Sequence, residues 1–128
     1  MNAAVIGKII LYAVGLVNAF SGAALVVAPL WFYENIGKFP PFNRHFLGDT
    51  GSFLFPIGVG VLFAARAPAH HRNLIGIAAL ANAIHALNHV YDSIVEPSPD
   101  QLFSNTIPVL VIAVALSWVW WDLSRNRI

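Results

Sequence analysis

Two histidines, His85 and His89, stand four residues apart in "NAIHALNHVYD", a stretch inside an otherwise apolar segment. Positions i and i+4 of an α-helix lie on one face, so the two imidazoles would be neighbours on a helix. Asp92 follows His89 by three residues and falls on the same face. Neutral imidazole and carboxylate are ligands for zinc, copper, iron and manganese. The stretch therefore contains the residue types and the spacing of a divalent metal site.

A second stretch, "NRHFLGDTGS", repeats these residue types at helical spacing, with His45 and Asp49 four residues apart. Two helices that run in opposite directions can bring such stretches to the same depth. We therefore predict one shared pocket. Its predicted metal ligands are His45, Asp49, His85, His89 and Asp92. Polar side chains predicted to bind a ligand around them are Asn18, Ser52, Asn82, Asn88 and Asn105.

The same residues admit other interpretations. They could form a proton relay or a pocket for a small polar ligand. They could also be structural, because histidine and asparagine often hydrogen-bond across transmembrane helices simply to hold them together. Ionisable groups inside a membrane are energetically costly and usually functional, which favours a site. The sequence names no reaction and no catalytic residue, and it favours a protein that is not an enzyme.

The composition indicates the environment in which these polar residues lie. Hydrophobic residues make up 58% of the 128 residues and charged residues only 10%, whereas a soluble domain carries about 25% charge. This favours an integral membrane protein, with the lipid bilayer as its first partner. The absence of cysteine excludes disulfides, thiolate metal sites and iron–sulfur clusters. A net charge of +1 offers no basic surface for nucleic acid.

Four apolar segments can be marked, and each approaches or exceeds the roughly 20 residues that cross a ~30 Å hydrocarbon core. They cover about residues 3–28, 47–65, 74–95 and 102–121. Backbone amides in that core need internal partners, so the segments must be helices. We predict an all-α protein: a single four-span domain over residues 1–128, folded as a compact antiparallel four-helix transmembrane bundle. The aromatic-rich connection 29–46 is predicted to lie in the headgroup layer.

The distribution of lysine and arginine predicts the orientation. With four spans, the two termini and the connection between the second and third spans share one side. That side holds the larger group of basic residues: Lys8, Arg66, Arg72, Arg125 and Arg127. The positive-inside rule then places both termini in the cytoplasm and the predicted pocket near the outer membrane face.

Three stretches carry a resemblance to a known family: "GLVNAFSGAALVVAPLWFYENIG", "GDTGSFLFPIGVGVLFAARAP" and "RNLIGIAALANAIHALNHVYD". A proline ends the first helix, the second helix is rich in glycine, and the third carries histidine and then aspartate. In these features the chain resembles the small four-helix membrane proteins called DoxX-like. The resemblance implies a four-helix antiparallel bundle in the bacterial cytoplasmic (inner) membrane. Some members of that group are subunits of membrane oxidoreductases, while "FPPFNRHFLGD" and the doubled histidine of "HALNH" are not general features of the group.

Two functions from different classes follow. The first is binding of a divalent metal or a small polar ligand in a His/Asp pocket near the outer face. The alternative is a non-catalytic accessory or scaffold subunit of a larger membrane complex, for which the resemblance implies an oxidoreductase. Association into a homo-oligomer or a larger membrane complex is compatible with both.

Overall fold

The protein is almost entirely helical in a computed structural model that describes residues 2–38 and 40–125. Over these residues there is no β-strand. The elements in chain order are α1 (Ala3–Val27), α2 (Pro29–Asn35), α3 (Arg44–Ala64), α4 (Arg72–Val95), α5 (Pro99–Gln101), the π-helical turn η1 (Leu102–Thr106) and α6 (Ile107–Arg125). Helices α1, α3 and α4, and the continuous segment Pro99–Arg125, are each long and apolar enough to cross a membrane. The all-helical prediction and the four apolar spans are thus confirmed.

Local sequence signals explain where the helices begin and end. The side chain of Asn2 accepts a hydrogen bond from the Ala4 amide and caps α1. Asn43 caps α3 in the same way by accepting from the Phe46 amide. Because an asparagine cap satisfies an amide that lacks an intrahelical partner, α3 begins three residues before the predicted start at residue 47.

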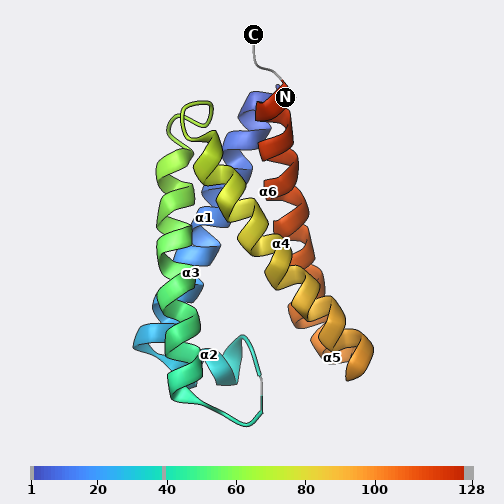
Figure 1. The fold of residues 1–128 in the computed structure, drawn as a ribbon. Coiled ribbons are helices and arrows are strands. Elements are labelled where there is room, and N and C mark those ends of the chain that lie inside the picture. The colour runs from blue at the N-terminus through green and yellow to red at the C-terminus, as the bar shows by residue number, and fades with distance from the viewer. Residues whose placement is uncertain (1, 39, 126–128) are drawn as a thin grey trace.

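The long helices form two closely packed pairs, α1 with α3 and α4 with α6 (Figure 1). The pairs meet at the end of the molecule that holds the chain termini and diverge toward the end that holds α2 and α5. All four long helices contribute to a buried apolar cluster. It comprises Leu11, Val14, Val61, Ala64, Ala65, Ile75, Ala78, Ala79, Leu116 and Val119.

Glycine permits the close approach of α1 and α3. A Cβ atom added at Gly58 would overlap the backbone of Ala19, and one added at Gly22 would overlap the backbone of Phe55. Close backbone packing of this kind replaces the hydrophobic driving force that lipid does not supply between helices. The α1–α3 pair is therefore in direct backbone contact along its middle.

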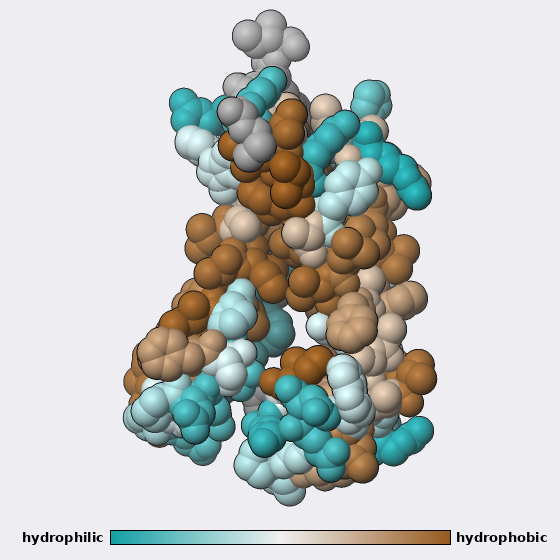
Figure 2. Space-filling model, turned by 180° about the vertical axis from the view of Figure 1, so that it is seen from behind, coloured by the Kyte–Doolittle hydropathy of each residue, from teal (hydrophilic) through white to brown (hydrophobic). Residues whose placement is uncertain are grey.

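The four helices are not equally close to one another, as a compact bundle would have them. Close packing unites the members of each pair, whereas α3 and α4 separate toward the end that holds α2. Figure 2 shows the result from behind: a hollow between two arms, apolar surface over the middle of the molecule, and hydrophilic groups gathered at both ends. The candidate site lies in this region between the two helix pairs.

The aromatic connection folds back against the first pair. Phe32 of α2 is buried in a small cluster with Leu25 of α1 and Leu47 of α3. Trp31, its neighbour, is 47% exposed and makes an edge-to-face contact with Phe20. One side of α2 therefore closes the end of the α1–α3 pair while the other faces outward.

Candidate functional site

A cavity of about 220 Å³ lies between the two helix pairs and is bordered at one end by α2. Most of its wall is aliphatic, but polar side chains enter it from α1, α3, α4 and η1. The polar lining residues are Asn18, Ser21, Thr50, Asn82, His85, His89, Ser104 and Asn105. The described residues that line it include no aspartate, glutamate, lysine or arginine. The cavity is thus uncharged but rich in hydrogen-bonding groups.

The two imidazoles of α4 form the polar centre of this wall. The Nε2 atoms of His85 and His89 lie 3.0 Å apart, which is hydrogen-bond distance. His89 is 9% exposed, while His85 is exposed toward the hollow. One ring must donate and the other accept in such a contact, so the neutral pair shares a single proton between the two facing nitrogens.

Asn82 lies one turn before His85 on α4 and forms an asparagine pair with Asn18 of α1. Asn82 donates from Nδ2 to the Ala78 carbonyl at 2.8 Å and accepts a longer contact of 3.5 Å from Asn18 of α1. Both side chains are buried. Asn18 and Asn82 thus lie opposite each other, and this contact links the two helix pairs by polar groups.

The π-helical turn η1 supplies the wall on the side of α6. Pro108 has no amide hydrogen to offer the Ser104 carbonyl one turn before it, so regular α-helical bonding cannot continue there. The widened turn carries Ser104 and Asn105 on the cavity wall. Such π-helical turns occur frequently at functional sites.

A hydroxyl contact fastens η1 to α4 next to the histidine pair. The Oγ of Ser93 and the Oγ1 of Thr106 lie 2.8 Å apart. Ser93 donates its hydroxyl hydrogen to the His89 carbonyl at 2.9 Å, so Thr106 is the donor in the hydroxyl contact, and the Thr106 Oγ1 also lies 3.4 Å from that carbonyl. The backbone that carries His89 is therefore held from two sides.

The cavity continues into a more open space of about 280 Å³ between α3 and α4. Four residues border both spaces: Thr50, Leu54, Asn82 and His85. The lining of this open space comes from α3 and α4 alone. An access route to His85 therefore runs sideways between the helices, at the level of the apolar surface.

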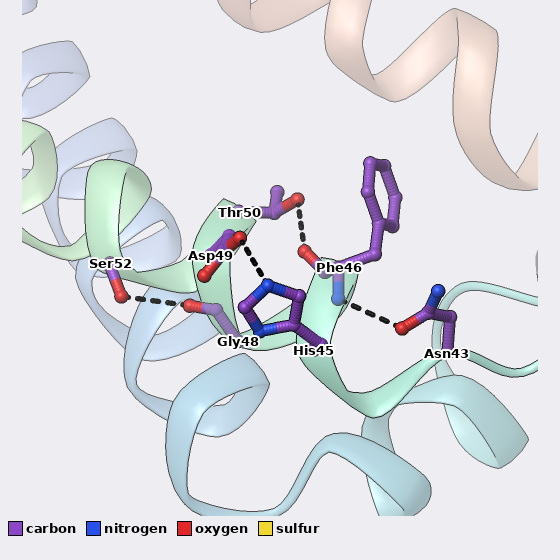
Figure 3. A network of polar contacts seen from close by, with 7 residues as sticks. All are labelled: Asn43, His45, Phe46, Gly48, Asp49, Thr50 and Ser52. Atoms are coloured by element: carbon purple, nitrogen blue, oxygen red, sulfur yellow. Dashed lines mark hydrogen bonds and ion pairs between the residues drawn. The ribbon is translucent and has the colours of Figure 1, made fainter.

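His45 and Asp49 do not line the cavity. They pair with each other along α3, with His45 Nε2 at 3.4 Å from Asp49 Oδ2, and their side chains are 89% and 62% exposed (Figure 3). Their neighbours are also bonded within the helix, since the hydroxyls of Thr50 and Ser52 donate to carbonyls four residues earlier. Ser52 is exposed and likewise absent from the cavity wall.

The glycines of α3 explain this orientation. Gly51 and Gly58, seven residues apart, point toward α1 because only a small residue fits there. At about 100° per residue, Asp49 then points roughly 160° away from Gly51 and His45 roughly 120° away. The polar face on which the predicted pocket relied is thus turned outward by the packing of the opposite face.

Asp92 and Asn88 also lie outside the cavity wall. Asn88 Nδ2 donates to Asp92 Oδ2 at 3.1 Å, and both residues are exposed near the end of α4. Asp92 shares the helix face of the two histidines. It lies closer to the end of α4, however, where the two helix pairs have diverged.

The structure therefore divides the predicted five-ligand site into separate parts. The histidine pair borders the cavity, the His45–Asp49 pair is on the outer side of α3, and Asp92 contacts Asn88. Within residues 2–38 and 40–125, no group of three or more histidine, aspartate or glutamate side chains is arranged to hold a metal ion. Of the ten predicted site residues, five border the cavity: Asn18, Asn82, His85, His89 and Asn105.

Three polar residues of the cavity wall, Ser21, Thr50 and Ser104, were not among the predicted site residues. Thr50 sits between Leu47 and Leu54 on the face of α3 that is adjacent to the glycine face. The spacing of Gly51 and Gly58 is the sequence signal for the position of Thr50. The glycine face of α3 packs on α1, and the orientation of that face determines which adjacent face of α3 points toward α4.

Comparison with known proteins adds no relative. No protein-family model, no curated protein and no solved structure matches the chain. The DoxX-like resemblance stays a prediction.

Proposed function

We propose that this is a bacterial inner-membrane protein, with both termini in the cytoplasm, that binds a small uncharged ligand with a polar head in the cavity between its two helix pairs. The four apolar helices support membrane integration. The excess of basic residues at the end that holds the termini supports the orientation. In this orientation the hollow opens within the outer half of an antiparallel four-helix arrangement, and α2 lies in the outer headgroup layer.

The observation that carries the proposal is the histidine pair at 3.0 Å on the wall of a cavity that also exposes asparagine amides. Polar groups at membrane depth are costly unless they have partners. The wall residues form some hydrogen bonds with one another. A ligand that donates or accepts hydrogen bonds would use more of their hydrogen-bonding capacity.

The lining defines the ligand class. The described wall carries no charged side chain, so a charged ligand would lose its hydration without a compensating counter-charge. Aliphatic wall area suits an apolar body, and the cluster of His85, His89 and Asn105 suits a carbonyl or hydroxyl group. The cavity and the adjoining open space together fall in the size range of small-molecule sites.

The route of entry follows from the open space between α3 and α4. A membrane-soluble molecule can enter from the lipid through this side without crossing the apolar cluster where the helix pairs meet. The ligand is therefore a lipid-soluble compound rather than a polar solute from the aqueous phase.

A direct test compares the small molecules that co-purify with the protein in lipid nanodiscs, extracted and identified by mass spectrometry. The double variant His85→Ala/His89→Ala removes the polar centre, and His45→Ala/Asp49→Ala removes a matched pair on the outer side of α3. We expect the first variant to retain roughly five- to thirtyfold less ligand, since a lost hydrogen bond to a buried site costs about 1–2 kcal/mol. Equal retention in the two variants would refute the proposal.

A divalent metal is the second candidate, and the same histidine distance favours it. Two nitrogens bound to a tetrahedral zinc ion at about 2.0–2.1 Å stand roughly 3.3 Å apart. The observed Nε2–Nε2 distance of 3.0 Å is close to this value. Metal analysis of untagged protein separates the candidates: metal present in the wild type and lost from the histidine double variant would favour the metal over the organic ligand. A partner protein recovered in equal amount, with neither ligand nor metal, would favour the accessory-subunit function.

A further inference from the structure

A long groove runs along the outer side of the α4–α6 pair, on a face separate from the cavity. It consists of two adjoining stretches of about 730 and 530 Å³. Ala83, Ser117 and Trp121 border both stretches, so the groove is continuous. It begins at Asn73, where α4 starts, and reaches Leu87.

Small residues make the floor of the groove and large exposed ones make its rims. Ala79, Ala86 and Ala113 are buried between the two helices. Leu80 and Val114 stand out on either side and are 62% and 66% exposed. The result is an open, shallow apolar channel parallel to the helices, along which a flexible hydrocarbon chain can lie.

The end of the groove nearest the chain termini is polar and aromatic. Trp120 lies across Gly76, where an added Cβ would come within 2.6 Å of the indole Nε1. Trp121 is 50% exposed, and the guanidinium of Arg125 lies 4.5 Å above its ring. Tryptophan beside an arginine is typical of the level where lipid headgroups begin.

We propose that the α4–α6 groove binds one anionic phospholipid of the leaflet on the side of the chain termini. One acyl chain lies in the channel, and the phosphate contacts Arg125 at its end. From Asn73 to Leu87 the groove is about 21 Å long at 1.5 Å per residue. One leaflet of a ~30 Å hydrocarbon core is roughly 15 Å deep, so the groove accommodates a chain that spans its leaflet.

The charge at the groove's end favours a lipid over a second copy of this chain. In a two-fold dimer each subunit presents the same surface, and an axis along the membrane normal keeps equal residues at equal depth. A dimer built across this groove would bring Arg125 toward Arg125, which is unfavourable. A phosphate, by contrast, complements the guanidinium and forms strong charge-assisted hydrogen bonds with it.

The test measures retention of dioleoyl phosphatidylglycerol and dioleoyl phosphatidylcholine by native mass spectrometry of the full chain. We expect the wild type to retain one phosphatidylglycerol with about a fivefold preference, the size of effect of one basic residue near a membrane surface. Arg125→Gln should abolish the preference while retaining a lipid. Ala83→Leu should reduce retention of both lipids at least tenfold because its side chain fills the channel.

Matched controls place the same changes elsewhere. Ala13→Leu adds the same side chain on the exposed side of α1, and Arg44→Gln removes a charge at the opposite end of the molecule. Neither should alter lipid retention. If Ala83→Leu does not fold, Ser117→Leu blocks the channel from the α6 side. The proposal is overturned if the blocked variants retain lipid, if the wild type shows no preference for phosphatidylglycerol, or if blocking the groove instead dissociates a dimer.

Discussion

The substitution Gly58→Ala tests the packing that forms the α1–α3 arm, which makes one wall of the cavity. The added methyl would overlap the backbone nitrogen of Ala19, a group that cannot move aside like the end of a flexible side chain. The helices must separate to accept it. Overpacking of this kind costs about 1–3 kcal/mol, which lowers the ratio of folded to unfolded protein by a factor of roughly five to 150.

Gly48→Ala is the matched control in the same helix. A Cβ added there meets nothing within 4 Å, so the identical chemical change costs no packing. Unfolding of both variants by sodium dodecyl sulfate in mixed micelles, followed by circular dichroism, gives the difference in the free energy of unfolding. The two effects on helix propensity are alike and cancel in the comparison. If Gly58→Ala and Gly48→Ala unfold at the same detergent fraction, α1 and α3 are not in backbone contact and the described arm is wrong.

Three further predictions concern individual polar contacts. A double-mutant cycle of Asn18→Ala and Asn82→Ala should give a coupling of about 0.6 kcal/mol or less in the unfolding free energy, because 3.5 Å is a long hydrogen bond; a coupling of 2 kcal/mol would contradict this geometry. Thr106→Val should lower the free energy of unfolding by about 1 kcal/mol, because it removes the hydroxyl contact to Ser93 at 2.8 Å. A free energy of unfolding equal to that of the wild type would show that the contact is not made. His45→Ala should change stability by less than about 0.5 kcal/mol, since it loses only an exposed ion pair; a loss above 1 kcal/mol in the same unfolding assay would indicate that this histidine is buried.

The polar stripe of α4 illustrates what could be predicted from sequence alone. Asn82, His85 and His89 recur at intervals of three and four residues, so they share a face in any α-helix, and all three border the cavity. This needed only the helical period. Asp92 continues the stripe by the same rule, yet it is exposed, because the helix pairs have already diverged at its level.

The face of α3 shows why the rest could not be predicted. His45 and Asp49 also share a helical face, but the period does not say toward which neighbour that face points. Gly51 and Gly58 decide the matter by packing on α1, and this contact turns the polar pair outward. If only the polar residues are considered, the face of α3 that carries His45 and Asp49 is wrongly taken to point into the protein.

By itself the amino-acid sequence determined that this protein consists of four apolar helices, because composition and segment length leave few other ways to satisfy the backbone in a membrane. It also determined which polar residues share a helix face. Only the tertiary structure decided which faces meet. Contact between helices depends on the shapes of both partners. Here glycines allow close packing within the α1–α3 pair and within the α4–α6 pair, and a cavity with polar wall residues remains where the two pairs diverge.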